Sequence, residues 1–338
     1  MKPLPLTTAL LGLALGSCTS LPTLDPEGLT RAGDFASGVE QARLTSDVQS
    51  LVDAHQSDTP LSCDLFAPGT NTERRPVCHV THENSRQFVR QRIEALGLKV
   101  TTQDVEDPRF PTTNLIAEIP GTEHPEEVVI VGAHYDAYFV GADDNSTGVS
   151  AVLEIARLAA GKHFKRTVRF LGFDLEELGL VGSTRYMQQS RGNERIVASI
   201  IFDCIGYRDT APGSQQGLPG FPLPSRGDFI AAIADEASRV RMEELYTLGQ
   251  QLQYVPVRGI VTPEDGSGAA SGNLMRSDHA PFWLTGQSAM LLTDTANFRN
   301  PHYHRDSDVF STLDLDFFTG VTKLSAAGLA YWAEGPLP

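Results

Sequence analysis

Hydrophobic and polar positions alternate with two different periods along most of the chain, and the change of period predicts its elements. Short apolar, β-branched runs such as residues 128–131 (VVIV) are typical of strands that are buried on both faces. Longer stretches with apolar residues at helical spacing, such as residues 149–160, are typical of amphipathic helices. From residue 114 onward strands and helices alternate, which predicts a mostly parallel sheet covered by helices on both faces.

The pattern can be resolved into individual elements. Helices are expected at residues 43–54, 82–96, 149–160, 180–189, 229–240 and 315–332. Strands are expected at residues 98–103, 114–119, 128–133, 167–173, 198–202 and 289–292. We therefore expect a single globular α/β domain over residues 38–338, with a mostly parallel mixed sheet flanked by helices on both faces.

The first residues read as an export signal. Lys2 precedes an apolar run at residues 9–15, which is too short to remain as a membrane-spanning helix, and residues 1–17 are expected to be a signal peptide. The run ends in LGSC, which resembles the lipobox of bacterial lipoproteins and implies that Cys18 becomes the lipid-modified first residue. The alternative is an ordinary secretory signal with a coincidental cysteine.

The segment that follows, residues 18–37, is polar and has no periodicity, so a lipidated tether is expected there. The protein is then an exported lipoprotein of the bacterial cell envelope, which touches the membrane only through its lipid. A soluble periplasmic or secreted form is the alternative. The sequence gives no indication of the oligomeric state.

Export changes the reading of the other cysteines, because disulfides persist in oxidising compartments. Cys63 and Cys78 bracket a turn-rich loop and are expected to form a local disulfide. Cys204 continues an apolar run and is expected to be a buried free thiol.

Composition narrows the class of partner. The net charge of −15 argues against nucleic acid, because no basic surface is available to neutralise phosphates. The apolar share of 41% in 338 residues is sufficient for a sizeable core.

Polar residues with metal-binding chemistry stand where the predicted strands end or the next helices begin. They are His134, Asp136, Asp144, Glu176, Glu177, Asp203 and His279. Because the carboxyl ends of parallel strands meet at one edge of a sheet, these side chains are expected to converge there. Each residue alone has an ordinary interpretation, as a helix cap or a core histidine. Together they suit zinc, and a shared carboxylate can bridge two ions.

At this point the chain resembles a known family, the co-catalytic di-zinc aminopeptidases of the bacterial leucyl aminopeptidase and aminopeptidase Y type. Glutaminyl cyclases and glutamate carboxypeptidases are relatives. The resemblance runs from about residue 114 to the C-terminus. Its motifs, in chain order, are GAHYD, GADDNSTG, the glutamate pair followed by GLVGS, IFD, SDHAPF and NPHYHRDSD.

The resemblance implies a role for each matched residue. His134 and Asp203 would bind one zinc ion, Glu177 and His279 a second, and Asp144 would bridge the two. Asp136 would hold the ring of His134, and Glu176 would be the general base. His304, with Tyr303 beside it, would lie near the substrate pocket, or His304 is only a solvated loop histidine.

The resemblance therefore implies an exported zinc exopeptidase, most simply an aminopeptidase that removes N-terminal residues from peptides with a water activated by two zinc ions. Ala137 and Cys204 depart from common family residues but leave the ligand set complete. One alternative is a glutaminyl-peptide cyclase on the same fold. The other is a non-catalytic binding module of the cell envelope.

Overall fold

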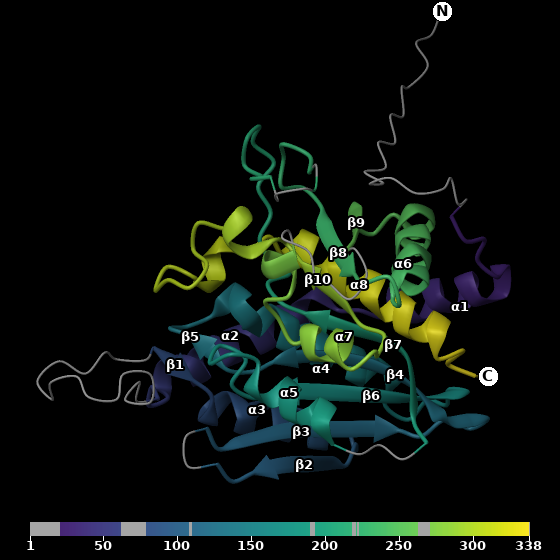
Figure 1. Ribbon diagram of the computed structural model, residues 1–338, viewed down its shortest axis with the longest axis horizontal. Coiled ribbons are helices and arrows are strands. Elements are labelled where there is room, and N and C mark those ends of the chain that lie inside the picture. The colour runs from purple at the N-terminus through teal and green to yellow at the C-terminus, as the bar shows by residue number, and fades with distance from the viewer. Residues whose placement is uncertain are drawn as a thin grey trace, which may run out of the picture.

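A mixed sheet of eight strands forms the centre of the computed structural model, which describes residues 21–61, 79–107, 110–189, 193–217, 221, 223–262 and 271–337. The strand order is β2-β3-β6-β4-β7-β10-β8-β9 (Figure 1). The four central strands β6, β4, β7 and β10 are parallel, and β2, β3 and β8 each run antiparallel to a neighbour. The expected mostly parallel α/β fold is confirmed.

The strands have the following bounds: β1 Val80–Thr81, β2 Val100–Val105, β3 Thr112–Ile119, β4 His124–His134, β5 Ala137–Tyr138, β6 Arg166–Phe173, β7 Arg195–Phe202, β8 Ile230–Ala234, β9 Val257–Val261 and β10 Met290–Thr293. The α-helices are α1 Pro26–Ser37, α2 Gln41–Ser57, α3 Glu83–Ala95, α4 Gly148–Ala159, α5 Val181–Gln188, α6 Arg239–Leu252, α7 Ala280–Leu284 and α8 Leu315–Trp332. A π-helical turn, η2 (Ala142–Thr147), precedes α4, and β1 pairs with β5 in a separate two-stranded sheet.

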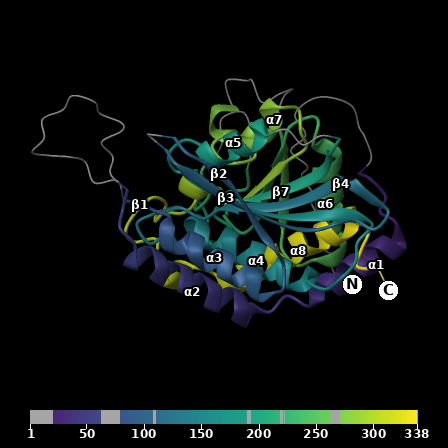
Figure 2. The same cartoon turned by 90° about the horizontal axis from the view of Figure 1, so that it is seen from below.

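Helices cover both faces of the large sheet (Figure 2). The helices α1, α2, α3, α4 and α8 lie on one face, and the shorter α5 and α7 lie on the other. Burial on both sides explains why the central strands carry no polar alternation: all four residues of the run at 128–131 are 0% exposed. The two faces form two hydrophobic clusters, and the sheet separates them.

The expectation of a tether over residues 18–37 is wrong for its second half, where α1 forms. Asp25 caps this helix by accepting a hydrogen bond from the backbone N–H of Gly28 at 2.6 Å, and Pro26 occupies the first helical turn. Phe35 is buried in the larger cluster, and α1 packs on α8. Three of the four buried residues of α1 are small, namely Gly28, Ala32 and Ala36, so the sequence shows only a weak apolar period there.

The expected helix at residues 229–240 is also wrong. Residues 230–234 form β8, a buried strand between β10 and β9, and the helix α6 begins only at Arg239. A short continuous apolar run has no period, so alanines in it do not distinguish a helix from a strand that is buried on both faces. The strand β9 was not expected either.

The predictions on the N-terminus and the disulfide fall outside the described residues, because Cys18, Cys63 and Cys78 all do. Signal cleavage, lipidation and the disulfide therefore stay predictions. Cys204 is a buried free thiol, as expected. In the described part of the chain, no helix is both long and apolar enough to cross a membrane.

Candidate metal centre

Side chains that can bind a metal meet at the carboxyl ends of the four parallel strands. Among the described residues, three groups have ligand atoms within 4.8 Å of one another. These groups are His134, Glu176 and Asp203; Asp144, Asp203 and Cys204; and Asp144, Glu177 and His304. Because the groups share Asp144 and Asp203, they form one continuous cluster.

His134 is the last residue of β4, and its ring is completely buried. The ring nitrogen Nδ1 lies 3.0 Å from the backbone carbonyl of Asp136. A carbonyl only accepts, so Nδ1 carries a proton, and in the neutral ring the free lone pair is on Nε2. Nε2 points into the cluster, 3.5 Å from Oδ1 of Asp144, and has no hydrogen-bond partner. This is the tautomer that a metal ligand needs.

Asp144 lies in the η2 turn, at the middle of the cluster. The carboxylate of Asp308 accepts hydrogen bonds from the backbone N–H groups of Asp143 (3.0 Å) and Asp144 (3.1 Å) and so fixes the turn. The two oxygens of Asp144 face different histidines. Oδ1 lies 3.5 Å from Nε2 of His134, and Oδ2 lies 3.1 Å from Nε2 of His304.

His304 comes from the long connection between β10 and α8. Its Nε2 lies 3.0 Å from Oε2 of Glu177 and has no well-aligned hydrogen bond. The ring stacks on Tyr303, with centroids 3.8 Å apart, and contacts the tilted ring of Tyr138 of β5 at 4.6 Å. The His304 side chain is 34% exposed, so this part of the cluster is open to solvent.

Asp136 acts on the backbone of the glutamate pair rather than chiefly on the ring of His134. Its Oδ1 accepts a hydrogen bond from the N–H of Glu176 at 3.0 Å, and its Oδ2 accepts one from Glu177 at 3.1 Å. The carboxylate lies 3.6 Å from Nδ1 of His134, farther than the Asp136 carbonyl. The role expected for Asp136 is thus shared between its carbonyl and its carboxylate.

His279 is not brought into the cluster, which corrects the expectation that it is a ligand. Its Nε2 donates a hydrogen bond to the carbonyl of Leu274 at 2.7 Å, and its ring lies edge-on to Trp283. Burial lowers the pKa of the His279 ring to about 4. It is a neutral core histidine, and His304 stands where His279 was expected.

The electrostatics of the cluster favour a bound cation. Burial, together with the nearby charge of Asp144, raises the pKa of Glu177 to about 8. Burial likewise raises the pKa of Glu176 well above its ordinary value. Buried atoms without hydrogen-bond partners point into the same space: Nε2 of His134, Oδ1 of Asp144, Oε1 of Glu177 and Nε2 of His304. Such a set of nitrogen and oxygen donors fits zinc.

Two acidic residues of the site were missed in the sequence. Asp308 follows His304 by four residues in the NPHYHRDSD motif, so the motif itself contained the signal. Asp278 is completely buried, and burial raises its pKa to about 7. It precedes His279, the residue of that motif that was chosen as the ligand.

A small cavity of about 50 Å³ opens beside Asp203 and Tyr303. Its apolar walls include Ile233, Leu291 and Phe298. The loop at residues 207–226 begins shortly after Asp203, but none of its described residues lines this cavity. Gln215 of that loop instead hydrogen-bonds Thr295 at 3.0 Å, one layer behind the cavity wall.

Comparison with known proteins decides the family. The sequence profile of peptidase family M28 matches residues 114–328, well over half of the chain. The chain belongs to peptidase family M28. YfbL of Escherichia coli, an uncharacterized protein, is 32% identical over 248 residues, which cover 68% of this chain and 74% of YfbL.

Two named aminopeptidases are also similar. Aminopeptidase YwaD of Bacillus subtilis is 34% identical over 177 residues, which are 51% of this chain but only 35% of YwaD. The crystal structure of LapA aminopeptidase from Legionella pneumophila superposes with a TM-score of 0.65 at 19% identity, covering 95% of this chain and 79% of LapA. At that sequence identity the superposition shows only that the two proteins share a fold. The expectations of this family and of a metallo-aminopeptidase type of enzyme are confirmed.

Proposed function

We propose that this protein is an exported aminopeptidase that works with two zinc ions. The observation that carries the proposal is the position of Asp144 between two histidines, with one carboxylate oxygen toward each. A carboxylate placed in this way can bridge two ions. His134 and Asp203 would hold one ion, and Glu177 and His304 the other.

A bound zinc pair would act as a Lewis acid on the substrate carbonyl and would make a water molecule more acidic. Glu176 is the residue we assign to proton transfer. Its carboxylate takes a proton from the attacking water and returns it to the leaving amine. Its backbone is held by Asp136, so the carboxylate is fixed beside His134 and Asp203.

Metal analysis of the purified protein, together with a panel of aminoacyl and N-blocked substrates, tests the proposal. Two equivalents of zinc and release of unblocked N-terminal residues are expected. Cleavage of blocked peptides from the C-terminal side would replace the aminopeptidase with a carboxypeptidase. Ammonia release from N-terminal glutamine without peptide cleavage would establish the cyclase instead.

We also propose that the mature chain begins at a lipidated Cys18, because LGSC resembles a lipobox. Mass spectrometry of the N-terminal peptide and membrane fractionation of a Cys18→Ser variant test this. An unmodified N-terminus elsewhere in a soluble wild type would contradict it.

The disulfide between Cys63 and Cys78 is a separate proposal. Closing a loop of this length stabilises a protein by about 3 kcal/mol. Mass spectrometry of non-reduced peptides is expected to find the two cysteines linked, and two alkylated thiols would exclude the bond.

A further inference from the structure

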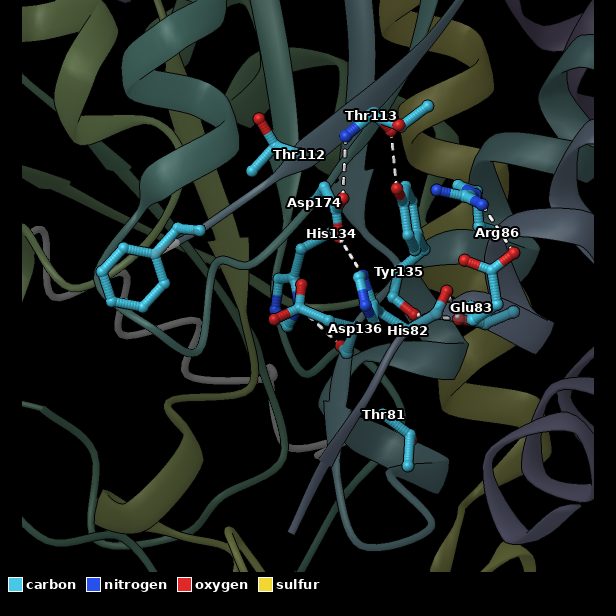
Figure 3. Close-up of polar contacts among 12 residues, drawn as sticks. Thr81, His82, Glu83, Arg86, Thr112, Thr113, His134, Tyr135, Asp136 and Asp174 are labelled. Carbon is cyan, nitrogen blue, oxygen red and sulfur yellow. Dashed lines mark hydrogen bonds and ion pairs between the residues drawn. The ribbon is translucent and has the colours of Figure 1, made fainter. Parts of the chain in front are cut away.

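The residues just before and within the first turn of α3 lie outside the segment that matches the family, yet two of them, His82 and Ser85, hydrogen-bond to the strand ends that position the metal centre. The match begins at residue 114, whereas β1 and the start of α3 lie at residues 80–86. Figure 3 shows His82 and Tyr135 close to the strand end that carries His134 and Asp136. Two hydrogen bonds connect this region to the two segments that supply most of the cluster.

The first hydrogen bond joins His82 to Asp174. Nδ1 of His82 lies 2.8 Å from Oδ1 of Asp174, and the two side chains are 14% and 1% exposed. Asp174 is the first residue after β6 and begins the loop that carries Glu176 and Glu177. Its other oxygen accepts a hydrogen bond from the N–H of Thr113 at 2.8 Å. The carboxylate is thus clamped between His82 and β3.

The second hydrogen bond joins Ser85 to the backbone between the two site residues of β4. Oγ of Ser85 lies 2.7 Å from the carbonyl oxygen of Tyr135 and donates to it. Ser85 is completely buried. This bond therefore fixes the peptide that links Tyr135 to Asp136, one residue after His134.

His82 and Ser85 are themselves held in place. Asp58, the residue after α2, accepts hydrogen bonds with one carboxylate oxygen from the backbone N–H groups of His82 (3.1 Å), Glu83 (2.7 Å) and Asn84 (3.1 Å). This is the capping arrangement that satisfies the free N–H groups of a helix start. Pairing of β1 with β5 fixes the preceding residues.

We propose that His82 is a positioning residue for the glutamate loop, and that the N-terminal segment thereby completes the metal centre from outside the family core. His82 holds Asp174, and Asp174 sets where the loop with Glu176 and Glu177 begins. Burial lowers the pKa of His82, but the bond to Asp174 outweighs burial and raises it, which strengthens the pair. The inference rests on the proposed function only for the measurement of kcat, because zinc affinity can be measured independently of activity.

Two substitutions at one position separate the hydrogen bond from the bulk of the ring. His82→Asn keeps a donor near the place of Nδ1, and His82→Ala removes it. Partners of this kind typically contribute about 10–100-fold to activity or metal affinity. We expect His82→Ala to lower kcat by about that factor while KM changes by less than about twofold, and His82→Asn to recover most of the loss.

Asp47→Asn is the matched control. Asp47 of α2 pairs with Arg92 of α3 at 2.7 Å, so the variant weakens the packing of the same helices without touching the centre. It is expected to lower Tm but not kcat per zinc-loaded molecule. If His82→Ala behaves like Asp47→Asn, or if His82→Asn fails to recover kcat, His82 has only a structural role and the inference is wrong.

The zinc dissociation constant provides a test that does not depend on peptide cleavage. It is measured on the full chain by competition with a chelator. His82→Ala is expected to weaken zinc binding more than Asp47→Asn does. If the wild type cleaves no peptide, the proposed function fails, but this difference in zinc affinity still supports or contradicts the positioning role. If His82→Ala does not fold, His82→Gln replaces it. The amide donor of glutamine lies one bond farther from the backbone than Nδ1 of histidine and is therefore misplaced for Asp174.

Discussion

The two halves of the metal centre are built in different ways. His134 and Asp203 stand at the ends of neighbouring central strands, are at most 9% exposed, and belong to the backbone network of the sheet. His304 comes from a long connection, has a left-handed backbone with φ of 56°, and is 34% exposed at its side chain. Its ring contacts two tyrosine rings, and its Nε2 lies near the carboxylates of Asp144 and Glu177.

This difference teaches how one cluster can combine a rigid position with an adjustable one. Ligands that project from a sheet are preorganised, because the strands fix their backbone before any metal binds. A ligand on a connecting segment is ordered partly by the metal, and this ordering reduces affinity. We therefore expect the sheet half, His134 with Asp203, to bind zinc more tightly than the loop half, Glu177 with His304.

The largest effect is expected for Glu176→Gln, which leaves both halves intact. The amide keeps the shape of the side chain but cannot accept the proton of water, so the rate is expected to fall about 10²–10⁴-fold. Zinc content should remain that of the wild type by metal analysis. If zinc is lost together with activity, Glu176 is a ligand and its assignment as base is wrong.

The comparison is tested directly by the pair His134→Ala and His304→Ala. Removing the preorganised ligand is expected to cost more zinc affinity than removing the loop ligand, and each should lower activity strongly. Metal titration of both variants measures the difference. His279→Ala serves as the control, since it should alter Tm and leave zinc content unchanged. Zinc loss in His279→Ala, without loss in His304→Ala, would restore the original expectation for His279.

A chelator sharpens the same comparison without mutation. Dialysis against a weak chelator should remove zinc in two stages, and the first equivalent should come from the exposed loop half. Activity is expected to fall with that first stage, because the reaction needs both positions. Release of both equivalents in a single stage would show that the halves are equivalent.

The smallest effect is expected for Asp308→Asn. Asp308 touches neither histidine, but its carboxylate holds the backbone of the η2 turn that carries Asp144. An amide can accept only with its carbonyl oxygen, so one of these contacts weakens and the bridge between the halves loosens. Activity is expected to fall about tenfold, at the lower end of the range for such partners. An unchanged kcat in a folded protein would remove Asp308 from the site.

The same contrast explains what could be predicted from the sequence. The run at 128–131, the glutamate pair and Asp203 were predictable, because buried strands have a clear pattern and their carboxyl ends converge. The choice between His279 and His304 was not. Both histidines stand in motifs that match the family. Only the fold shows that the ring of His279 packs against Trp283, whereas the ring of His304 lies beside Asp144.

Long-range contacts were beyond sequence reasoning for the same reason. The pairing of His82 with Asp174 joins positions 92 residues apart, and no local pattern indicates it. The helix predicted over residues 229–240 was wrong for a different reason. The local apolar run at residues 230–234 is compatible with either a helix or a buried strand. Tertiary packing between β10 and β9 selected the strand.

The position of α1 has a consequence for orientation. The N–H of Asp25 donates to the hydroxyl of Tyr331 at 3.1 Å, and the end of α8 contacts Arg166, the first residue of β6. The start of α1 therefore lies at the amino edge of the sheet, opposite the carboxyl edge that carries the centre (Figure 1). Cys18 precedes Asp25 by seven residues, a reach of at most about 25 Å. If Cys18 carries the proposed lipid, the centre would face away from the lipid surface and would meet peptides in the surrounding fluid.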